Sequence, residues 1–253
     1  MCIRDRLPAT STRTSQLEFA HFGRRVSLGS EAENIDPDLS ARDLATDRYL
    51  VAWANDLRRP DRPWVIDTTV DAFADWSGGE HIQNGWSVNL GYSLPLNPQQ
   101  SLRIAADYEE TTRLDRDVRS FEKWTALATW TGRFNDIGRF QVNARYEDVS
   151  SDSFAVARDQ WSLAINYSLP TPVLGADLSL SALYSETSYD EPLFGPAARS
   201  DRTQVASLTA GFPSLEYLGF SPYAQLSNEH VDSNVSRFET DTFNFGVSIR
   251  SNF

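Results

Sequence analysis

The side chains that most often carry out catalysis or bind metals are scarce and scattered in this sequence. The three histidines, His21, His81 and His230, lie far apart and lack the His-x-x-x-His spacing of a metal-binding helix. The single cysteine is Cys2, and neither a Gly-x-Ser-x-Gly motif nor a glycine-rich phosphate loop occurs. We therefore expect no metal, no cofactor, no catalytic residues and no enzymatic activity.

Neighbouring carboxylates are the remaining candidates for acid–base chemistry. Glu109 and Glu110 fall at the end of a predicted strand, and Asp115 and Asp117 fall in a predicted loop. Such positions are typical of a solvated rim, and no nucleophile or base accompanies the carboxylates. The net charge of −12 also argues against a nucleic-acid partner, because phosphate binding needs a basic face.

A period of two in the hydrophobic pattern dominates the chain from about residue 47 onward. The segment 85–94 places Trp86, Val88, Leu90 and Tyr92 on one side, with small or polar residues between them. Side chains alternate between the two faces of a strand, so the pattern predicts strands with one apolar and one polar face. About 12 strands are expected, in the segments 16–29, 48–56, 64–76, 85–94, 101–110, 123–130, 139–148, 160–169, 176–185, 203–212, 219–228 and 243–253.

The polar faces of these strands are where we expect function to lie. They mix charges of both signs with Ser, Thr and Asn, which predicts a hydrated lumen whose charges pair with one another. A basic ladder, which would indicate an anion pore, is absent from the sequence pattern. The lumen-facing charged candidates are Arg103, Asp107, Glu109, Lys123, Arg145, Glu147 and Arg250, with Asp67 and Asp71.

The connections between the strands favour a membrane barrel. Short segments rich in Pro, Gly, Asn and Asp are expected as turns at 58–63, 95–100, 133–138, 170–176 and 213–219. Longer polar segments are expected as loops at 30–46, 77–85, 110–120, 148–159, 186–202 and 229–240. Strict alternation of short and long connections is typical of outer-membrane barrels, whose short turns are periplasmic. On this pattern the last strand runs toward the periplasm.

Aromatic residues mark the ends of the apolar faces. From Trp64 to Trp76 the span is roughly 30 Å at ~3.4 Å per residue and a tilt of about 40°, which brackets the roughly 25 Å apolar band of membrane barrels. A soluble sandwich would place its largest residues in mid-strand, where this chain has Val, Leu, Ala and Ile. The girdle candidates are Trp64, Trp76, Trp86, Tyr92, Trp124, Trp130, Trp161 and Tyr167.

These patterns predict an all-β fold, a transmembrane antiparallel up-and-down β-barrel in the outer membrane of a Gram-negative bacterium. The mean hydropathy of −0.43 agrees with this class, because apolar-out and polar-in residues alternate. Outer-membrane lipid and lipopolysaccharide are then the expected surroundings.

The two ends of the chain carry different signals. Residues 1–6, MCIRDR, resemble the translated end of a transposase adapter used for sequencing libraries, and we interpret them as a non-native scar that includes Cys2. Residues 7–253 are then a single outer-membrane β-barrel domain, incomplete at the N-terminus. The C-terminal alternation resembles the signal read by the bacterial barrel-assembly machinery, although Ser251 departs from it; the signal residues are Phe243, Phe245, Val247, Ile249 and Phe253.

The last quarter of the chain carries four short motifs in order: Arg199 to Asp201, Gly219 to Pro222, Ser233-Asn234 and the terminal Phe253. These motifs resemble the end of the surface lipoprotein assembly modifiers, called Slam. In that family an Arg-x-Asp-like motif precedes a strand, followed by a Gly-Phe-x-Pro strand, a Ser-Asn loop and a final strand ending in Phe. The resemblance implies a 14-stranded barrel that follows a periplasmic tetratricopeptide-type domain and helps export lipoproteins to the cell surface.

Three functions remain open on the sequence. The first is a non-catalytic barrel that helps translocate a lipoprotein client. The second is a passive, porin-like channel, which the composition of the lumen does not distinguish from the first. The third is a soluble β-sandwich binding module.

Overall fold

The computed structural model describes residues 2–3, 12–24, 46–59, 62–114, 119–153, 155–192, 197–217 and 220–251. Apart from two short 3-10 helices, η2 (Pro213–Leu215) and η3 (Ser236–Phe238), every regular element in this part of the chain is a strand. The strands are β1 (Cys2–Ile3), β2 (Thr12–Arg24), β3 (Thr46–Arg58), β4 (Val65–Ser77), β5 (Glu80–Asn97), β6 (Gln100–Arg113), β7 (Phe121–Phe134), β8 (Gly138–Ser151), β9 (Arg158–Ser168), β10 (Asp177–Tyr189), β11 (Ser200–Gly211), β12 (Phe220–Ser233) and β13 (Thr240–Ser251).

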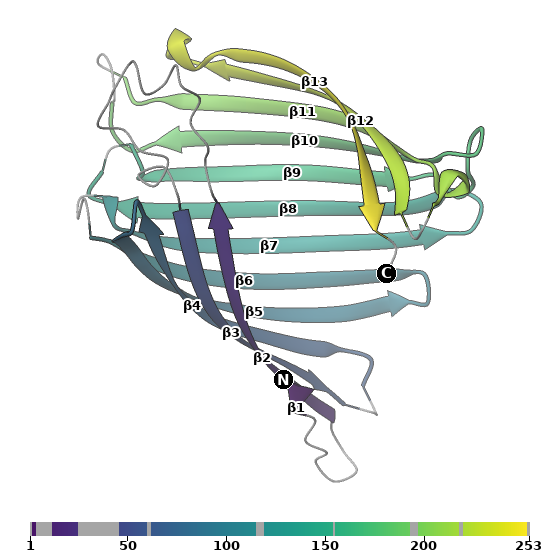
Figure 1. Cartoon of the computed structure of the whole chain (residues 1–253), viewed down its shortest axis with the longest axis horizontal. Coiled ribbons are helices and arrows are strands. Elements are labelled where there is room, and N and C mark those ends of the chain that lie inside the picture. Colours follow the sequence, from purple (N-terminus) through teal and green to yellow (C-terminus); the bar gives the residue numbers. More distant parts are fainter. Residues whose placement is uncertain are drawn as a thin grey trace. The chain divides into compact units, whose positions relative to one another are not determined.

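The strands follow the order of the sequence, from β1 to β13, with hydrogen-bonded neighbours throughout. The registers described for β1–β4 and for β9–β13 are all antiparallel. In Figure 1, for example, β10 lies between β9 and β11. This is the up-and-down topology expected from the sequence, and β2 to β13 correspond to the twelve predicted strands. The two-residue β1 lies within the segment interpreted as a scar and pairs with β2.

The chain divides into two compact units, and both contain parts of the central strands. Unit 1 comprises Met1–Tyr92, Ala105–Trp124 and Val149–Val156, and unit 2 comprises Ser93–Ile104, Thr125–Asp148 and Ala157–Phe253. No helix in the described residues is long and apolar enough to cross a membrane.

Each unit exposes its apolar face and buries polar residues. In unit 1, Leu90 is 55% exposed, whereas Thr111 is 2% exposed. In unit 2, Leu180 is 47% exposed, whereas Glu147 is only 6% exposed. A soluble sandwich would bury the apolar face instead, because burial of apolar surface is what drives folding in water. The arrangement therefore excludes the soluble sandwich considered above.

The predicted alternation of short and long connections is wrong. The segment 77–85, expected as a long loop, contains a turn of Gly78 and Gly79 between paired strands, and both glycines have the positive φ angles that such hairpin turns require, +63° and +86°. The connections around 170–176 and 213–219, expected to be short, are no shorter than the one between β8 and β9. The strands continue past the apolar band through polar rim residues, which give no hydropathy signal. The direction of the last strand stays a prediction.

Leu90→Arg on the exposed apolar face of β5 is expected to lower the free energy of unfolding by roughly 2–4 kcal/mol, as for a cation placed at mid-bilayer on the lipid face. Asn89→Arg, on the opposite face of the same strand, is the matched control and should cost clearly less. Urea unfolding of the chain refolded into lipid vesicles measures both values. Equal losses for the two variants would contradict the assignment of the faces.

Candidate functional site: a paired-charge network on the polar face

The polar face of unit 1 carries an arginine–aspartate pair held by two strands. Arg48 of β3 lies directly opposite Asp75 of β4 in the register. Its Nε and Nη2 atoms donate to the two carboxylate oxygens of Asp75, each at 2.7 Å. The Arg48 guanidinium also lies 4.3 Å from the centroid of the Phe73 ring on the same face. This bidentate geometry fixes both charges, and Asp75 is 9% exposed.

Amide and guanidinium groups from the next strands extend this pair into a chain. Gln83 of β5 donates from Nε2 to Asp75 at 2.6 Å, and Arg113 of β6 donates from Nη1 to the Gln83 carbonyl oxygen at 3.3 Å. The carboxylate of Asp75 is therefore satisfied from both sides. Such a network holds the strands in one register, because shifting any strand would break several charged contacts.

Two further carboxylates on the polar face of unit 1 have partners from neighbouring strands. Lys123 of β7 forms an ion pair with Glu109 of β6, which also accepts a hydrogen bond from the buried Thr111 at 3.3 Å. Ser87 donates to Asp71 at 2.5 Å. The sequence assigned Lys123 and Glu109 to one face of the predicted strands, and in the structure the two side chains form an ion pair.

In unit 2 a buried glutamate is shared by two arginines. Glu147 of β8 pairs with Arg145 on the same face, and with Arg158 of β9 at 3.2 Å. Nearby on this face, Asn143 accepts hydrogen bonds from Thr129 at 2.9 Å and from Gln141 at 3.1 Å. A polar lining forms from these residues, and its charges compensate one another.

Two of the segments that carry the family resemblance, Arg199 to Asp201 and Ser233-Asn234, lie side by side at one end of unit 2. Arg199 donates from Nε to Asp201 at 3.0 Å, and its guanidinium lies 3.5 Å from the centroid of the Phe238 ring. Asn234 bridges to the same segment: its side chain donates to the Ala198 carbonyl at 2.7 Å and accepts from the Ser200 N–H at 2.8 Å. We call this set of contacts the loop clamp. It joins the β10–β11 connection to the β12–β13 connection.

The remaining lumen-facing candidates are Arg103, Asp107, Asp67 and Arg250. Arg103, Asp107 and Asp67 are half-buried, and each takes part in an interaction. The side chain of Arg250, and Phe253 as a whole, lie outside the described residues. The other members of the C-terminal signal all lie on the exposed face of β13, with exposed fractions of 67% to 68%: Phe243, Phe245, Val247 and Ile249.

The aromatic candidates form small clusters with residues on neighbouring strands. Tyr108 lies between Trp86 and Trp124, with ring centroids 5.2 and 4.6 Å away, and the Trp86 indole donates to Glu110 at 3.1 Å. Trp161 contacts Tyr184 at 5.2 Å and donates to Glu186 at 3.1 Å. Such rings combine an apolar body with a polar tip, which suits a membrane–water interface.

The other aromatic candidates contact aromatic rings or a glycine elsewhere along the strands. Trp76 stacks on His81 at 4.5 Å and meets Tyr49 edge-on at 5.2 Å. Trp64 lies 6.2 Å from Tyr92, and Tyr167 stacks on Phe140 at 4.6 Å. Trp130 packs close to Gly132, where an added Cβ would lie 2.7 Å from its ring.

The described residues offer little that could react or bind a metal. Among them, no three His, Cys, Asp or Glu side chains gather as metal ligands. His21 pairs with Asp47 at 2.8 Å, His81 with Asn84 at 2.6 Å and His230 with Asp232 at 3.1 Å. What the arrangement offers is a polar, charge-compensated face opposite an apolar one.

Sequence reasoning left several members of the network out of the candidates, among them Arg113, which fell in the expected loop 110–120. Arg48 opens the predicted strand 48–56 on the face opposite Tyr49, so the alternation already placed it on the polar face, but it was not named as a lumen-facing candidate. Arg158 fell in an expected loop, because β9 begins before its first aromatic residue. Gln83 fell in the segment 77–85, where the tight turn was missed.

No protein-family model matches the chain, and no curated protein matches it. Several solved structures do match the chain. The siderophore receptor PirA from Pseudomonas aeruginosa is 14% identical with a TM-score of 0.55, covering 97% of this chain and 42% of the receptor. The ferric enterobactin receptor PfeA from Pseudomonas aeruginosa, solved with enterobactin, is 12% identical with a TM-score of 0.55, covering 97% and 43%. OccAB3 from Acinetobacter baumannii is 10% identical with a TM-score of 0.50, covering 82% and 69%.

The fold is that of an outer-membrane β-barrel. At these identities the likeness concerns the fold alone, and the chain spans less than half the length of the two siderophore receptors. The predicted fold class is confirmed. Because the exposed faces are apolar, this fold places the chain in the outer membrane of a Gram-negative bacterium, as the sequence predicted. The polar face is the one that the sequence predicts to line the lumen.

Asp75→Asn should lower the free energy of unfolding by about 1–3 kcal/mol, because the nearly buried carboxylate of Asp75 loses its charge-assisted bonds from Arg48. Asp56→Asn is a matched control: its nearest arginine nitrogen, Arg58 Nη2, is 3.8 Å away and both side chains are substantially exposed. The control should change stability by less than about 1 kcal/mol. Denaturant titration in vesicles compares the two, and a cost for Asp75→Asn no larger than the control's would refute a structural role for the network.

Proposed function

We propose that this chain is a non-catalytic outer-membrane barrel that helps translocate lipoproteins to the cell surface, as in the Slam family. The observation that carries the proposal is the loop clamp. Asn234 of the Ser-Asn loop lies far in sequence from the Arg199–x–Asp201 motif, yet its side chain hydrogen-bonds to the backbone of Ala198 and Ser200, on either side of Arg199. Motif residues that converge on one structural feature support a common origin better than scattered matches do.

The lumen lining agrees with a role in handling a polypeptide. Its charges occur as compensated pairs, such as Arg48 with Asp75 and the two arginines around Glu147. A lining of this kind presents little net field to a passing chain, whereas an ion-selective pore concentrates one sign of charge. Nothing in this arrangement requires catalysis by the barrel.

The other proposed partners follow from the fold. Lipid and lipopolysaccharide surround the exposed apolar face, and the barrel-assembly machinery inserts the chain by reading its C-terminal strand. In β13 the apolar residues Phe243 to Ile249 all lie on one exposed face, which suits recognition of an alternating signal.

A passive, porin-like channel is the second candidate. The polar, hydrated lining of the lumen is the observation in its favour, because water and small solutes would also pass such a surface. The two proposals differ in what is lost when the protein is removed: a surface lipoprotein in the first case, and permeability to small solutes in the second.

Deletion of the gene in its native cell tests the proposal. Surface proteins are labelled with a membrane-impermeant biotin reagent, and the labelled lipoproteins are compared between the two strains. At least one lipoprotein should lose surface labelling by about tenfold or more, while its total amount in the outer membrane is unchanged. The wild-type chain should restore the labelling.

Two variants sharpen this test. Asn234→Ala removes both side-chain bonds of the loop clamp and should restore surface labelling several-fold less well than the wild type. Asn135→Ala, in the exposed connection between β7 and β8, is the matched control and should restore it fully. Unchanged lipoprotein labelling after deletion would overturn the proposal, and a simultaneous loss of solute uptake would favour the porin-like channel.

A further inference from the structure

The exposed face of β9 to β13 is built from registered rows of side chains, and its polarity changes from row to row. The apolar row contains Tyr167, Leu180, Leu208, Leu226 and Phe245. The next row, which we call the alanine row, contains Ile165, Ala182, Ala206, Asn228 and Phe243. The polar row contains Leu163, Tyr184, Gln204, His230 and Asp241, and the rim row contains Trp161, Glu186, Arg202 and Asp232.

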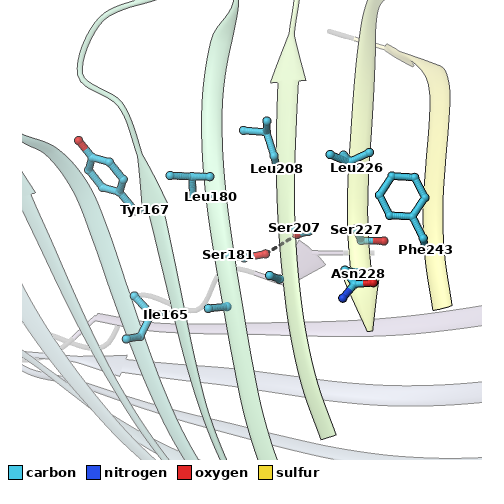
Figure 2. A pocket seen from close by; sticks show the side chains of 12 residues that line it. Ile165, Tyr167, Leu180, Ser181, Ser207, Leu208, Leu226, Ser227, Asn228 and Phe243 are labelled. Carbon is cyan, nitrogen blue, oxygen red and sulfur yellow. Dashed lines mark hydrogen bonds between the residues drawn. The ribbon is translucent and has the colours of Figure 1, made fainter. Parts of the chain in front are cut away.

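A groove runs across these rows. Its apolar part has a volume of about 470 Å³, and the alanines Ala182 and Ala206 leave the space that the flanking residues enclose. Figure 2 shows Leu180, Leu208 and Leu226 on three adjacent strands, with Asn228 and Phe243 beside them. A second part, of about 480 Å³, shares Ala182, Ala206 and Asn228 and continues to the polar row. The groove therefore leads from apolar side chains to polar ones.

Two carboxamides in this groove have no hydrogen-bond partner. Asn228 and Gln204 both lie on the exposed face, and neither side chain bonds to another group in the described part of the chain. Asn228 lies beside Ala206 and Phe243 on the apolar outer face, where an unsatisfied amide group costs free energy, and Gln204 lies one row nearer the charged rim. A ligand with hydrogen-bonding groups beside its hydrocarbon would satisfy both amides.

The charges at the edge of the groove argue against a phosphate headgroup. Arg202 is already paired with Glu186 at 3.2 Å, and Glu186 also accepts bonds from Trp161 and Tyr184. His230 lies between Asp232 and Asp241, at 3.1 and 4.0 Å. Carboxylates therefore outnumber available cations in the described polar and rim rows, and an anionic lipid would be repelled. A headgroup of neutral amides and esters suits this site.

We propose that the groove binds the lipid anchor of an acylated protein, with an acyl chain along Ala182 and Ala206. The amide and ester groups of the acylated cysteine then receive hydrogen bonds from Asn228 and Gln204. This inference rests on the proposed function, since it places the anchor of the lipoprotein client on the outer wall of the barrel. The polypeptide part would be handled separately from the anchor.

The test uses the whole chain in vesicles of phosphatidylethanolamine and phosphatidylglycerol. The probe is a synthetic triacylated cysteinyl peptide of neutral sequence that carries a photoreactive diazirine in one acyl chain. Photolysis followed by mass spectrometry should place most cross-links on β10, β11 and β12. Excess unlabelled lipopeptide should compete at least fivefold better than the same peptide without acyl chains.

Variants separate the groove from general lipid contact. Asn228→Leu removes the hydrogen-bonding group and Ala206→Trp fills the groove, and each should reduce cross-linking at least fivefold. Ala72→Trp, at an exposed position of β4, is the matched control and should leave it unchanged. Gel mobility with and without heating checks folding. Because Asn228→Leu makes a lipid-facing position more apolar, it keeps the test decisive if Ala206→Trp does not fold.

Cross-links spread evenly over the exposed face, or unaffected by Asn228→Leu, would overturn the inference. So would equally efficient labelling of the groove by a photoreactive phospholipid, which would make it a general lipid site. These results are independent of lipoprotein export in cells. If surface labelling depends on the gene but the groove does not bind the probe, the inference alone fails. If the groove binds the probe but deletion leaves surface lipoproteins unchanged, the proposed export function fails instead.

Discussion

The constraint on which this structure depends is that hydrocarbon supplies no hydrogen bonds to the backbone. Every peptide group within the bilayer must pair with a neighbouring strand, and this is why the described elements are long antiparallel strands in sequence order. Strand β12 illustrates the point, since it pairs along most of its length with both β11 and β13. Pro222, which lacks an N–H, lies near the end of this strand, where the loss of one ladder bond costs least.

The same constraint inverts the usual distribution of side chains. Once the outer face meets lipid, residues such as Leu90 and Phe245 are stable while exposed, and the polar residues turn to the other face. There the buried ones need partners, because a polar group shielded from water costs free energy unless it is hydrogen-bonded. The bidentate pair of Arg48 and Asp75, and the sharing of Glu147 between two arginines, are the result. These pairs also fix the register of the strands.

The strands and their faces could be predicted from the sequence, because residues such as Trp86, Val88 and Leu90 show a period of two directly. The ends of the strands could not be predicted in the same way. Gly78 and Gly79 form a tight turn within a segment whose polar residues suggested a loop, since rim residues look alike whether they are paired or not. Pairing between distant residues could not be predicted either, because it depends on the register of the strands. Examples are Arg48 with Asp75, and Asn234 with the backbone at Ala198 and Ser200. Partner choice across strands has no local signal.

Spin labelling along β5 tests the central claim most directly. Single-cysteine variants from Trp86 to Tyr92, made in a Cys2→Ser background and labelled with a nitroxide in vesicles, report oxygen accessibility against that of a water-soluble nickel complex. Oxygen accessibility should be highest at Trp86, Val88, Leu90 and Tyr92 and lower at the residues between them, giving a period of two. A profile without this period, or with the nickel complex reaching Leu90 as readily as Asn89, would contradict the account.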